Sequence, residues 1–254
     1  MNYVEKEPFR SYSIYYDLIY RDKNYCDETS YVSELIHSTN PFAKNLLELG
    51  CGTGNYANFF CKKGFFVTGI EKSIDMLKQS KLKHIDKFTP VLGNMIDFKL
   101  QDKVEVAVAL FHVISYLSNN EDVIACFKNV CNSLKDKGLF IFDVWYTPAV
   151  YFLQPEARVK EVENDYYKVT RHAHTTLLEE KNLVEVNYEI IISEKSTSSY
   201  NQIQETHKMR HFSTPEIELL AKICGFKLIR SEEFLTAKIP SINTWCVCYM
   251  LQKI

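Results

Sequence analysis

The chain has 254 residues with a formal net charge of −2, and hydrophobic and charged residues make up 46 % and 24 % of it. This length and composition suit one large α/β domain with room for an inserted subdomain, and the near-neutral charge argues against a nucleic-acid partner. No apolar stretch is long enough to span a membrane and charges occur throughout the first twenty residues, so we expect no membrane span, no signal peptide and a cytoplasmic location.

The first part of the chain predicts alternating helices and strands. Residues 1–40 are aromatic and polar and predict two helices, at 12–20 and 27–38. From Asn45 onward the predicted strands are 45–50, 65–71, 88–94, 104–111 and 139–145, and the predicted helices between them are 55–64, 73–83 and 120–138. Alternation at this spacing indicates right-handed βαβ units and a doubly wound parallel sheet.

After Trp145 the alternation stops. The runs 159–163, 166–176, 182–195 and 201–212 are rich in β-branched and aromatic residues and predict three or four antiparallel strands. A helix at 214–225 and two closing strands at 226–234 and 243–252 follow. The predicted fold class is therefore α/β: a doubly wound Rossmann-like sheet with an antiparallel β subdomain inserted before the last helix and two strands.

This pattern divides the chain into four parts. We expect an N-terminal helical segment at 1–40 and a cofactor-binding core at 41–147. An antiparallel substrate cap at 148–212 and the closing helix and strands of the core at 213–254 complete the prediction. The edge of the inserted sheet offers a surface for a homodimer.

The cysteines and histidines do not form a metal-binding pattern. None of the eight cysteines belongs to a CxxC pair, and most lie in apolar stretches, so we expect free thiols in a reducing compartment. His172 and His174 share one strand face and His211 ends another strand, but a third ligand is not evident. We therefore predict no metal site.

A glycine-rich turn follows the first predicted strand. Gly50, Gly52 and Gly54 stand in a GxGxG spacing between strand and helix, where backbone N–H groups and a helix N-terminus can meet a ligand. A nucleoside triphosphate loop needs a GxxxxGK[ST] pattern, which is absent. A dinucleotide fingerprint needs a glycine where Asn55 stands, so the turn favours another adenosine cofactor.

Polar residues at successive strand ends support this interpretation. Glu48 precedes the turn, and Glu71 ends the second strand, where a carboxylate can accept both hydroxyls of a ribose. At the end of the third strand, the Asn94 amide and the neighbouring backbone can read an adenine edge.

Four stretches resemble class I S-adenosylmethionine-dependent methyltransferases: 46–56 (LLELGCGTGNY), 67–77 (VTGIEKSIDML), 93–98 (GNMIDF) and 134–145 (LKDKGLFIFDVW). Within that class the chain is most similar to the branch of nucleotide-linked amino-sugar N-methyltransferases, through 15–28 (YYDLIYRDKNYCDE), 110–117 (LFHVISYL) and the β-rich insertion. The resemblance covers nearly the whole chain. It implies the class I methyltransferase fold and S-adenosyl-L-methionine as the cofactor.

The resemblance also implies which residues contact the cofactor, with the N-terminal segment folded over it as a lid. They are Tyr16, Arg21, Tyr25, Glu48, Gly50, Cys51, Gly52, Gly54, Glu71, Lys72, Met76, Asn94, Met95, Phe111 and His112. The sequence departs from the family pattern at Asn94, where aspartate is usual, and at Glu71, where aspartate is commoner. Both residues keep a hydrogen-bond acceptor, so the predicted cofactor is unchanged.

Two residues are candidates for catalysis. Methyl transfer is an in-line displacement, so the acceptor must be held close and aligned, and an amine acceptor must be neutral. His112 follows the fourth strand at the expected switch region and is the best candidate for a base. We expect Tyr16 near the transferring methyl, where an aromatic face can hold a cation. The alternatives are a histidine that only lines the cleft and a tyrosine that only packs.

The expected acceptor-binding residues lie in the N-terminal segment, after the fifth strand and in the inserted sheet: Tyr20, Trp145, Tyr146, Arg158, Arg171, His172, His174 and Arg210. The aromatic residues after the fifth strand could stack on a sugar or form a hinge. The arginines are candidates for a substrate phosphate or for solvated surface charges.

The predicted function is methyl transfer to a small molecule, with the amine of a nucleotide-linked amino sugar as the leading acceptor. One alternative is O- or N-methylation of another small metabolite. A second, of another class, is a catalytically silent scaffold or sensor that binds the cofactor. Nucleic-acid methylation is disfavoured because FHVISY stands where a base-flipping motif would follow the fourth strand.

Overall fold

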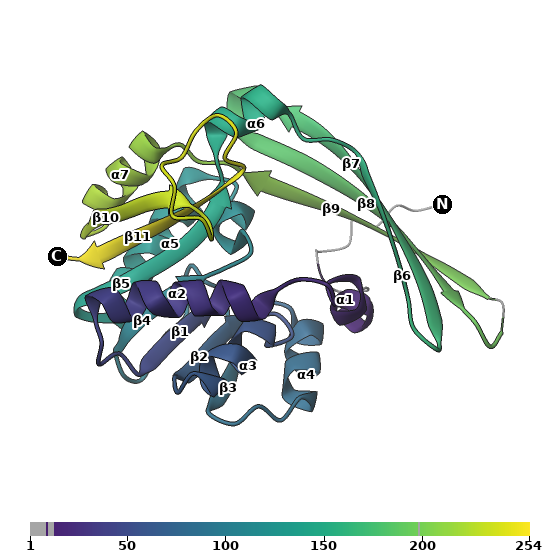
Figure 1. Cartoon of the computed structure of the whole chain (residues 1–254), viewed down its shortest axis with the longest axis horizontal. Coiled ribbons are helices and arrows are strands. Elements are labelled where there is room, and N and C mark those ends of the chain that lie inside the picture. The colour runs from purple at the N-terminus through teal and green to yellow at the C-terminus, as the bar shows by residue number, and fades with distance from the viewer. Residues whose placement is uncertain (1–8, 10–12, 198) are drawn as a thin grey trace.

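The computed structural model describes residue 9, residues 13–197 and residues 199–254. These residues form two β-sheets with helices packed around the larger one (Figure 1). The seven-stranded sheet has the order β10-β11-β5-β4-β1-β2-β3, and the four-stranded sheet has the order β6-β7-β8-β9. The predicted α/β fold with an inserted antiparallel sheet is confirmed.

The larger sheet is mostly parallel. Its strands are β1 (Asn45–Leu49), β2 (Phe66–Glu71), β3 (Phe88–Leu92), β4 (Val104–Ala109), β5 (Leu134–Trp145), β10 (Phe226–Glu233) and β11 (Cys246–Lys253). The first five run parallel, whereas β11 pairs antiparallel with β5 and β10 pairs antiparallel with β11. The strand order reverses between β1 and β4, and in such sheets this switch point is where ligands bind.

Helices cover both faces of this sheet because its strands are apolar on both sides. On β1, Leu47 and Leu49 pack in the same cluster as α5 (Asn120–Ser133) and α7 (Thr214–Ile223). Leu46, which points the other way, packs with α2 (Tyr25–Thr39) and α3 (Asn55–Lys62). The helix α4 (Ile74–Leu82) lies against β2 and β3. The side-chain period of two therefore divides the core into two layers.

The smaller sheet forms a long cap beside the core. Its strands are β6 (Arg158–Glu163), β7 (Tyr167–Leu178), β8 (Leu183–Glu194) and β9 (Tyr200–Arg210), with a 3-10 turn, η2 (Glu179–Lys181), between β7 and β8. The helix α6 (Thr147–Leu153) leads into the cap, and α1 (Ser13–Ile19) lies between the cap and α4 (Figure 1). This arrangement places the carboxyl ends of the parallel strands opposite the cap.

One expected helix boundary needs correction, and two short helices were not expected. The predicted helix at 120–138 ends at Ser133, because Leu134 is already extended and pairs with Val104 as β5 begins. The helix α6 and the 3-10 helix η1 (Val113–Tyr116) were not predicted, since each is too short for a clear helical period. The predicted helix at 12–20 appears as α1, with residue 12 outside the described part of the chain.

In the part of the chain that the structure describes, no helix combines the length and the apolar character needed to cross a bilayer.

The glycine-rich turn offers a matched pair of substitutions. Gly50 and Gly52 have φ angles of +60° and +53°, so alanine strains the backbone at both positions. A Cβ at Gly50 would also lie 2.8 Å from both Val113 methyl carbons, whereas a Cβ at Gly52 would meet nothing within 4 Å. We expect Gly50→Ala to lower the free energy of unfolding by about 1–3 kcal/mol more than Gly52→Ala, measured by urea denaturation. Equal losses would show that Val113 moves aside without cost.

Candidate active site

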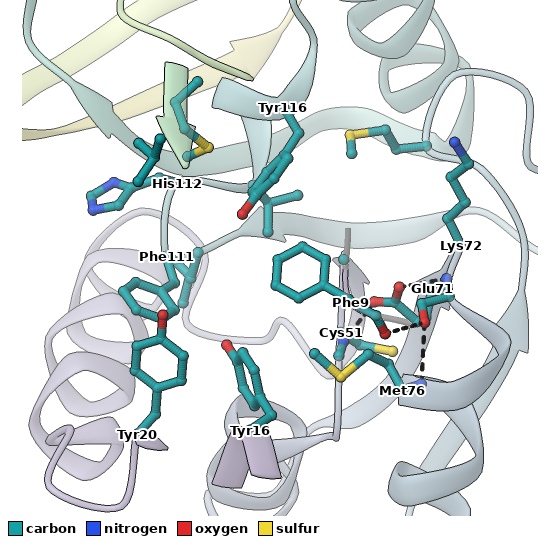
Figure 2. A pocket seen from close by; sticks show the side chains of 18 of the residues that line it. Phe9, Tyr16, Tyr20, Cys51, Glu71, Lys72, Met76, Phe111, His112 and Tyr116 are labelled. Carbon is teal, nitrogen blue, oxygen red and sulfur yellow. Dashed lines mark hydrogen bonds between the residues drawn. The ribbon is translucent and has the colours of Figure 1, made fainter. Parts of the chain in front are cut away.

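A cavity of about 950 Å³ lies at the carboxyl ends of the parallel strands, between the core and the cap. The turns after β1, β2, β3 and β4 form one wall, and residues of α1, β7, β8 and β9 form the opposite wall. Figure 2 shows Glu71, Cys51 and Met76 together on one side of this space and His112 with Phe111 on the other. The cavity is therefore large enough for a cofactor and a second small molecule.

The Glu71 side chain is bonded to the glycine turn and to the start of α4 through backbone N–H groups. The Glu71 carboxylate accepts the Gly52 N–H at 2.8 Å through Oε2 and the Ser73 N–H at 2.7 Å through Oε1. Burial raises the pKa of Glu71, and these backbone N–H groups oppose that rise. Each carboxylate oxygen keeps a further acceptor site, so the side chain can also receive ribose hydroxyls.

Most of the predicted cofactor residues line this cavity. They are Tyr16, Tyr25, Gly50, Cys51, Gly52, Glu71, Lys72, Met76, Asn94, Met95, Phe111 and His112. The sequence separates them by up to about a hundred positions, and the parallel sheet brings them together because their strands end at one edge.

Three predicted cofactor residues lie elsewhere. Arg21 is exposed and donates to the Glu163 carbonyl at 2.7 Å, so it ties the N-terminal segment to β6. Glu48 is buried inside β1, where burial and then the nearby Glu71 carboxylate raise its pKa well above the ordinary value. Gly54 is the left-handed N-cap of α3, and a Cβ at this position would meet the side chains of Phe88 and Ile85. None of these three residues lines the cavity, so their contact with the cofactor stays a prediction, and Gly54 shapes the turn.

The N-terminal helix α1 is attached to the glycine turn by a charged cluster. Asp17 accepts the Thr53 hydroxyl at 2.6 Å and the Asn55 amide at 3.0 Å. Lys83 lies 2.7 Å from the other oxygen of Asp17 and also donates to the Asn55 carbonyl oxygen at 2.6 Å. These bonds attach α1 to the turn beside the cavity, and its role as a lid stays a prediction.

His112 forms a buried pair with Asp143. The loop after β4 turns through two left-handed residues, Phe111 and His112, and Asp143 accepts their N–H groups at 2.7 and 3.2 Å. The His112 Nδ1 lies 2.7 Å from Asp143 Oδ2. Burial alone would raise the pKa of Asp143, but the interactions with His112 outweigh it and hold the pKa below the ordinary value. Asp143 therefore stays ionised at neutral pH and directs the Nδ1 proton of His112, leaving Nε2 as an acceptor.

The Cys246 thiol completes this cluster. Its sulfur lies 3.4 Å from Asp143 Oδ2 and 4.0 Å from His112 Nδ1, so the three side chains are close enough to share a metal ion. The existing hydrogen bonds already occupy the Asp143 oxygens and Nδ1. We therefore interpret the cluster as a hydrogen-bonded pair with an adjacent thiol.

Four predicted acceptor-binding residues line the cavity: Tyr20, Trp145, Arg158 and Arg171. The Arg171 guanidinium lies 5.3 Å from the ring centre of Tyr20 and 5.0 Å from that of Tyr188, and it donates to the Tyr20 hydroxyl at 2.7 Å. A planar cation held between two rings keeps its orientation, which suits recognition of an anionic group.

The other four predicted acceptor-binding residues lie outside the cavity. Along β7, Arg171, Ala173 and Thr175 face the cavity, so His172 and His174 point to the opposite face of the cap. Tyr146 packs against the core cluster and begins α6. Arg210 donates to Asn120 at 2.8 Å and pairs with Glu216 at 2.6 Å, which connects β9 to α5 and α7. The cavity therefore gives no support to these four residues, and their contact with the acceptor stays a prediction.

Several cavity residues were not predicted. Tyr116 lies in the quoted stretch 110–117, and Tyr188 and Lys208 lie on cap strands. Asp143 does not line the cavity but is buried against His112; it stands in the apolar run LFIFDVW, where a charge in a buried strand was the signal that could have drawn attention to it. Phe9 is isolated from the predicted elements, so the sequence offered no signal for it.

The cavity fits S-adenosylmethionine. Gly50 and Gly52 leave room for close approach to the backbone, Glu71 offers carboxylate oxygens, and Met76 supplies an apolar surface. The aromatic rings of Tyr16 and Phe111 lie in the same cavity, where their faces can accommodate a cation.

Comparison with known proteins identifies the family. Residues 18–230 match a family model described as a methyltransferase domain. The chain is 27% identical over 215 residues to dTDP-3-amino-3,4,6-trideoxy-alpha-D-glucopyranose N,N-dimethyltransferase of Streptomyces venezuelae, covering 84% of this chain and 89% of that protein. It is also 27% identical over 222 residues to the putative methyltransferase YqeM of Bacillus subtilis (strain 168), covering 86% and 87%.

Solved structures of methyltransferases have a similar fold. A crystal structure of an S-adenosylmethionine-dependent methyltransferase from Clostridium acetobutylicum ATCC 824 superposes with a TM-score of 0.80 at 20% identity, covering 94% of this chain and 96% of that one. The chain therefore belongs to the methyltransferase domain family, and it shares its fold with this S-adenosylmethionine-dependent methyltransferase.

Proposed function

We propose that this protein methylates the amine of a nucleotide-linked amino sugar. The observation that carries the proposal is the opposite wall of the cavity, where the cap presents Arg158, Arg171 and Lys208 to the same space as Glu71. Basic side chains on that wall complement the negative charge of a nucleoside diphosphate, and the guanidinium of Arg171 can bind a phosphate through two N–H groups. The named activity of the Streptomyces venezuelae relative supports the same acceptor class.

Bound S-adenosylmethionine supplies an electrophilic methyl group. The chain's own residues then have to hold the acceptor nitrogen in line and keep it neutral. His112 can accept a proton at Nε2, since Asp143 occupies Nδ1 and stabilises the resulting imidazolium. Tyr16 remains a neutral phenol, because burial and then the neighbouring tyrosines raise its pKa well above the ordinary value. Its ring can therefore lie beside a cation without reacting with it.

The test is transfer of an isotope-labelled methyl group to a panel of acceptors. We expect label on nucleotide-linked amino sugars and none on matched hydroxyl sugars, free amino acids or simple amines. Label on hydroxyl sugars or amino acids would replace the proposed acceptor. The panel is needed because the chain is 27% identical both to the amino-sugar methyltransferase and to a putative methyltransferase whose name states no substrate. Absence of label with every acceptor, despite S-adenosylhomocysteine binding, would support a silent cofactor-binding protein.

The role of Arg171 has a matched control one residue away. We expect Arg171→Met to raise KM for a nucleotide-linked amino sugar about 10-fold and to leave KM for the free amino sugar unchanged, because only the former carries phosphate. His172→Ala, on the opposite face of β7, should change neither value. Equal effects of Arg171→Met on both acceptors would exclude phosphate recognition by this side chain.

A further inference from the structure

A second series of hydrogen-bonded side chains extends from the cap to the cavity. The Tyr116 hydroxyl lies 2.8 Å from His207 Nδ1, and His207 Nε2 lies 3.2 Å from Glu205 Oε2. Glu205 and His207 are 2 % and 1 % exposed, so this polar group is almost completely removed from solvent. In Figure 2 the Tyr116 hydroxyl points into the space bounded by His112, Phe9 and Tyr16. This series of hydrogen bonds therefore ends, at the Tyr116 hydroxyl, where an acceptor would lie.

The direction of these hydrogen bonds follows from the backbone of Phe9. The Phe9 N–H donates to Glu205 Oε2 at 2.8 Å, and a backbone N–H can only donate. The Phe9 bond favours this oxygen as an acceptor for His207 as well, and we therefore assign the imidazole proton to Nε2. In neutral His207 the Nδ1 atom then has only a lone pair, so Tyr116 donates its hydroxyl proton to Nδ1.

This direction leaves the Tyr116 oxygen with lone pairs, and no proton, facing the cavity. Burial raises the pKa of Tyr116 well above its ordinary value, with the nearby groups Tyr188, Tyr20 and Glu205 adding to the rise. Tyr116 therefore stays a phenol whose proton is committed to His207. It can only accept a hydrogen bond from a molecule in the cavity.

An amine and a hydroxyl differ in the number of hydrogens they offer to such a site. A neutral primary amine has two N–H groups and one lone pair, whereas a hydroxyl has one O–H. We take His112 Nε2 and the Tyr116 oxygen, both of residues that line the cavity, as the two acceptors for one nitrogen. An amine then satisfies both, and its lone pair is left free to attack. A hydroxyl satisfies only one, and a buried polar group left without its partner lowers transition-state stabilisation.

We propose that Tyr116, held as a hydrogen-bond acceptor by His207 and Glu205, orients the acceptor amine and makes the site select nitrogen over oxygen. This inference rests on the proposed N-methylation and assigns to the cap a role in choosing the nucleophile. Tyr116 touches the acceptor, whereas His207 and Glu205 are positioning residues that act through it.

The kinetic test uses Tyr116→Phe, which removes only the hydroxyl. We expect kcat for a primary amine acceptor to fall about 10- to 100-fold, with KM for S-adenosylmethionine unchanged, because the nucleophile is misoriented while the cofactor wall is intact. Any transfer to the matched hydroxyl sugar should not fall. The control is Tyr151→Phe, whose hydroxyl bonds to Glu179 and Asn182 on the exposed side of the cap. An unchanged kcat in Tyr116→Phe would overturn the proposal.

The positioning residues have a readout that needs no acceptor. In ¹⁵N NMR of the wild-type protein, we expect His207 to carry its proton on Nε2 and to show an Nδ1 resonance that shifts when Tyr116→Phe removes the hydroxyl donor. Glu205→Gln should preserve both signals and kcat, because its amide oxygen can accept from Phe9 and His207 alike. Glu205→Leu should lose the tautomer preference and lower kcat while leaving KM for the cofactor unchanged.

These measurements separate the inference from the proposed function. A proton on Nδ1 of His207 in the wild type would overturn the inference whatever the acceptor is. Label on hydroxyl sugars alone would refute N-methylation and, with it, the selection of nitrogen, while the NMR result would still decide the hydrogen-bond direction.

Discussion

Replacing Glu71 with alanine should weaken S-adenosylhomocysteine binding by about 100-fold and abolish measurable methyl transfer. The expected loss is large because the Glu71 carboxylate has two tasks. It holds the Gly52 and Ser73 N–H groups at 2.8 and 2.7 Å, which fixes the glycine turn, and its remaining acceptor sites face the cavity. Each hydrogen bond to a charged group contributes about 1.5–3 kcal/mol, so losing two accounts for the expected factor. Isothermal titration calorimetry with S-adenosylhomocysteine measures it.

Glu105 provides the matched control for Glu71. It accepts the Asn45 N–H at 2.7 Å and contacts Lys135, but it lies at the amino end of β4, away from the cavity. Glu105→Ala should therefore lower thermal stability and leave S-adenosylhomocysteine affinity unchanged. If Glu71→Ala bound the ligand within about threefold of the wild type, Glu71 would be only a brace for the turn and the ribose assignment would fail.

Replacing His112 with alanine should lower kcat by about 10²- to 10⁴-fold, the range expected for a positioned general base. KM for S-adenosylmethionine should change little, because Gly52 and Glu71 on the opposite side of the cavity are untouched. Asp143→Asn should also lower kcat, since an amide cannot stabilise the imidazolium as the carboxylate does. Steady-state kinetics with a saturating amine acceptor measures both effects.

The two substitutions should be far from additive. His112 and Asp143 act as a unit, so the double variant should be about as slow as His112→Ala alone. The control is His174→Ala, which alters a histidine on the outer face of the cap and should leave kcat unchanged. A loss of less than about threefold in His112→Ala would show that the acceptor binds already neutral and that His112 only lines the cleft.

Local patterns allowed most of the fold to be predicted. The alternation of apolar strands and helices from Asn45 to Trp145, and the later β-rich runs, correspond to the two observed sheets. The helix at 120–138 was predicted too long, because its last residues contain no strong breaker before Gly138 and the pairing of Leu134 with Val104 is a contact across the sheet. The division into four parts and the homodimer edge stay predictions.

The site was predictable where function depends on a local motif. The glycine turn, Glu71 and Asn94 follow strand ends, and a parallel sheet brings strand ends to one edge. Arg171 and His172 show the limit of that reasoning. Alternation on β7 requires the two side chains to point oppositely, but only the packing of the cap on the core decides which of them faces the cavity.

The sequence by itself determined the order of the elements, the glycine turn and the cofactor class, because these depend on residues that are close together in the chain. Only the tertiary structure decided the two sets of hydrogen-bonded side chains beside the cavity, Asp143 with His112 and His207 with Tyr116. Asp143 meets His112 across 31 residues, and His207 meets Tyr116 across 91. Such pairs arise from the order of the strands in the sheet and from the docking of the cap on the core. Burial of the whole apolar surface sets both, so the residues of a pair carry no periodic signal in the sequence.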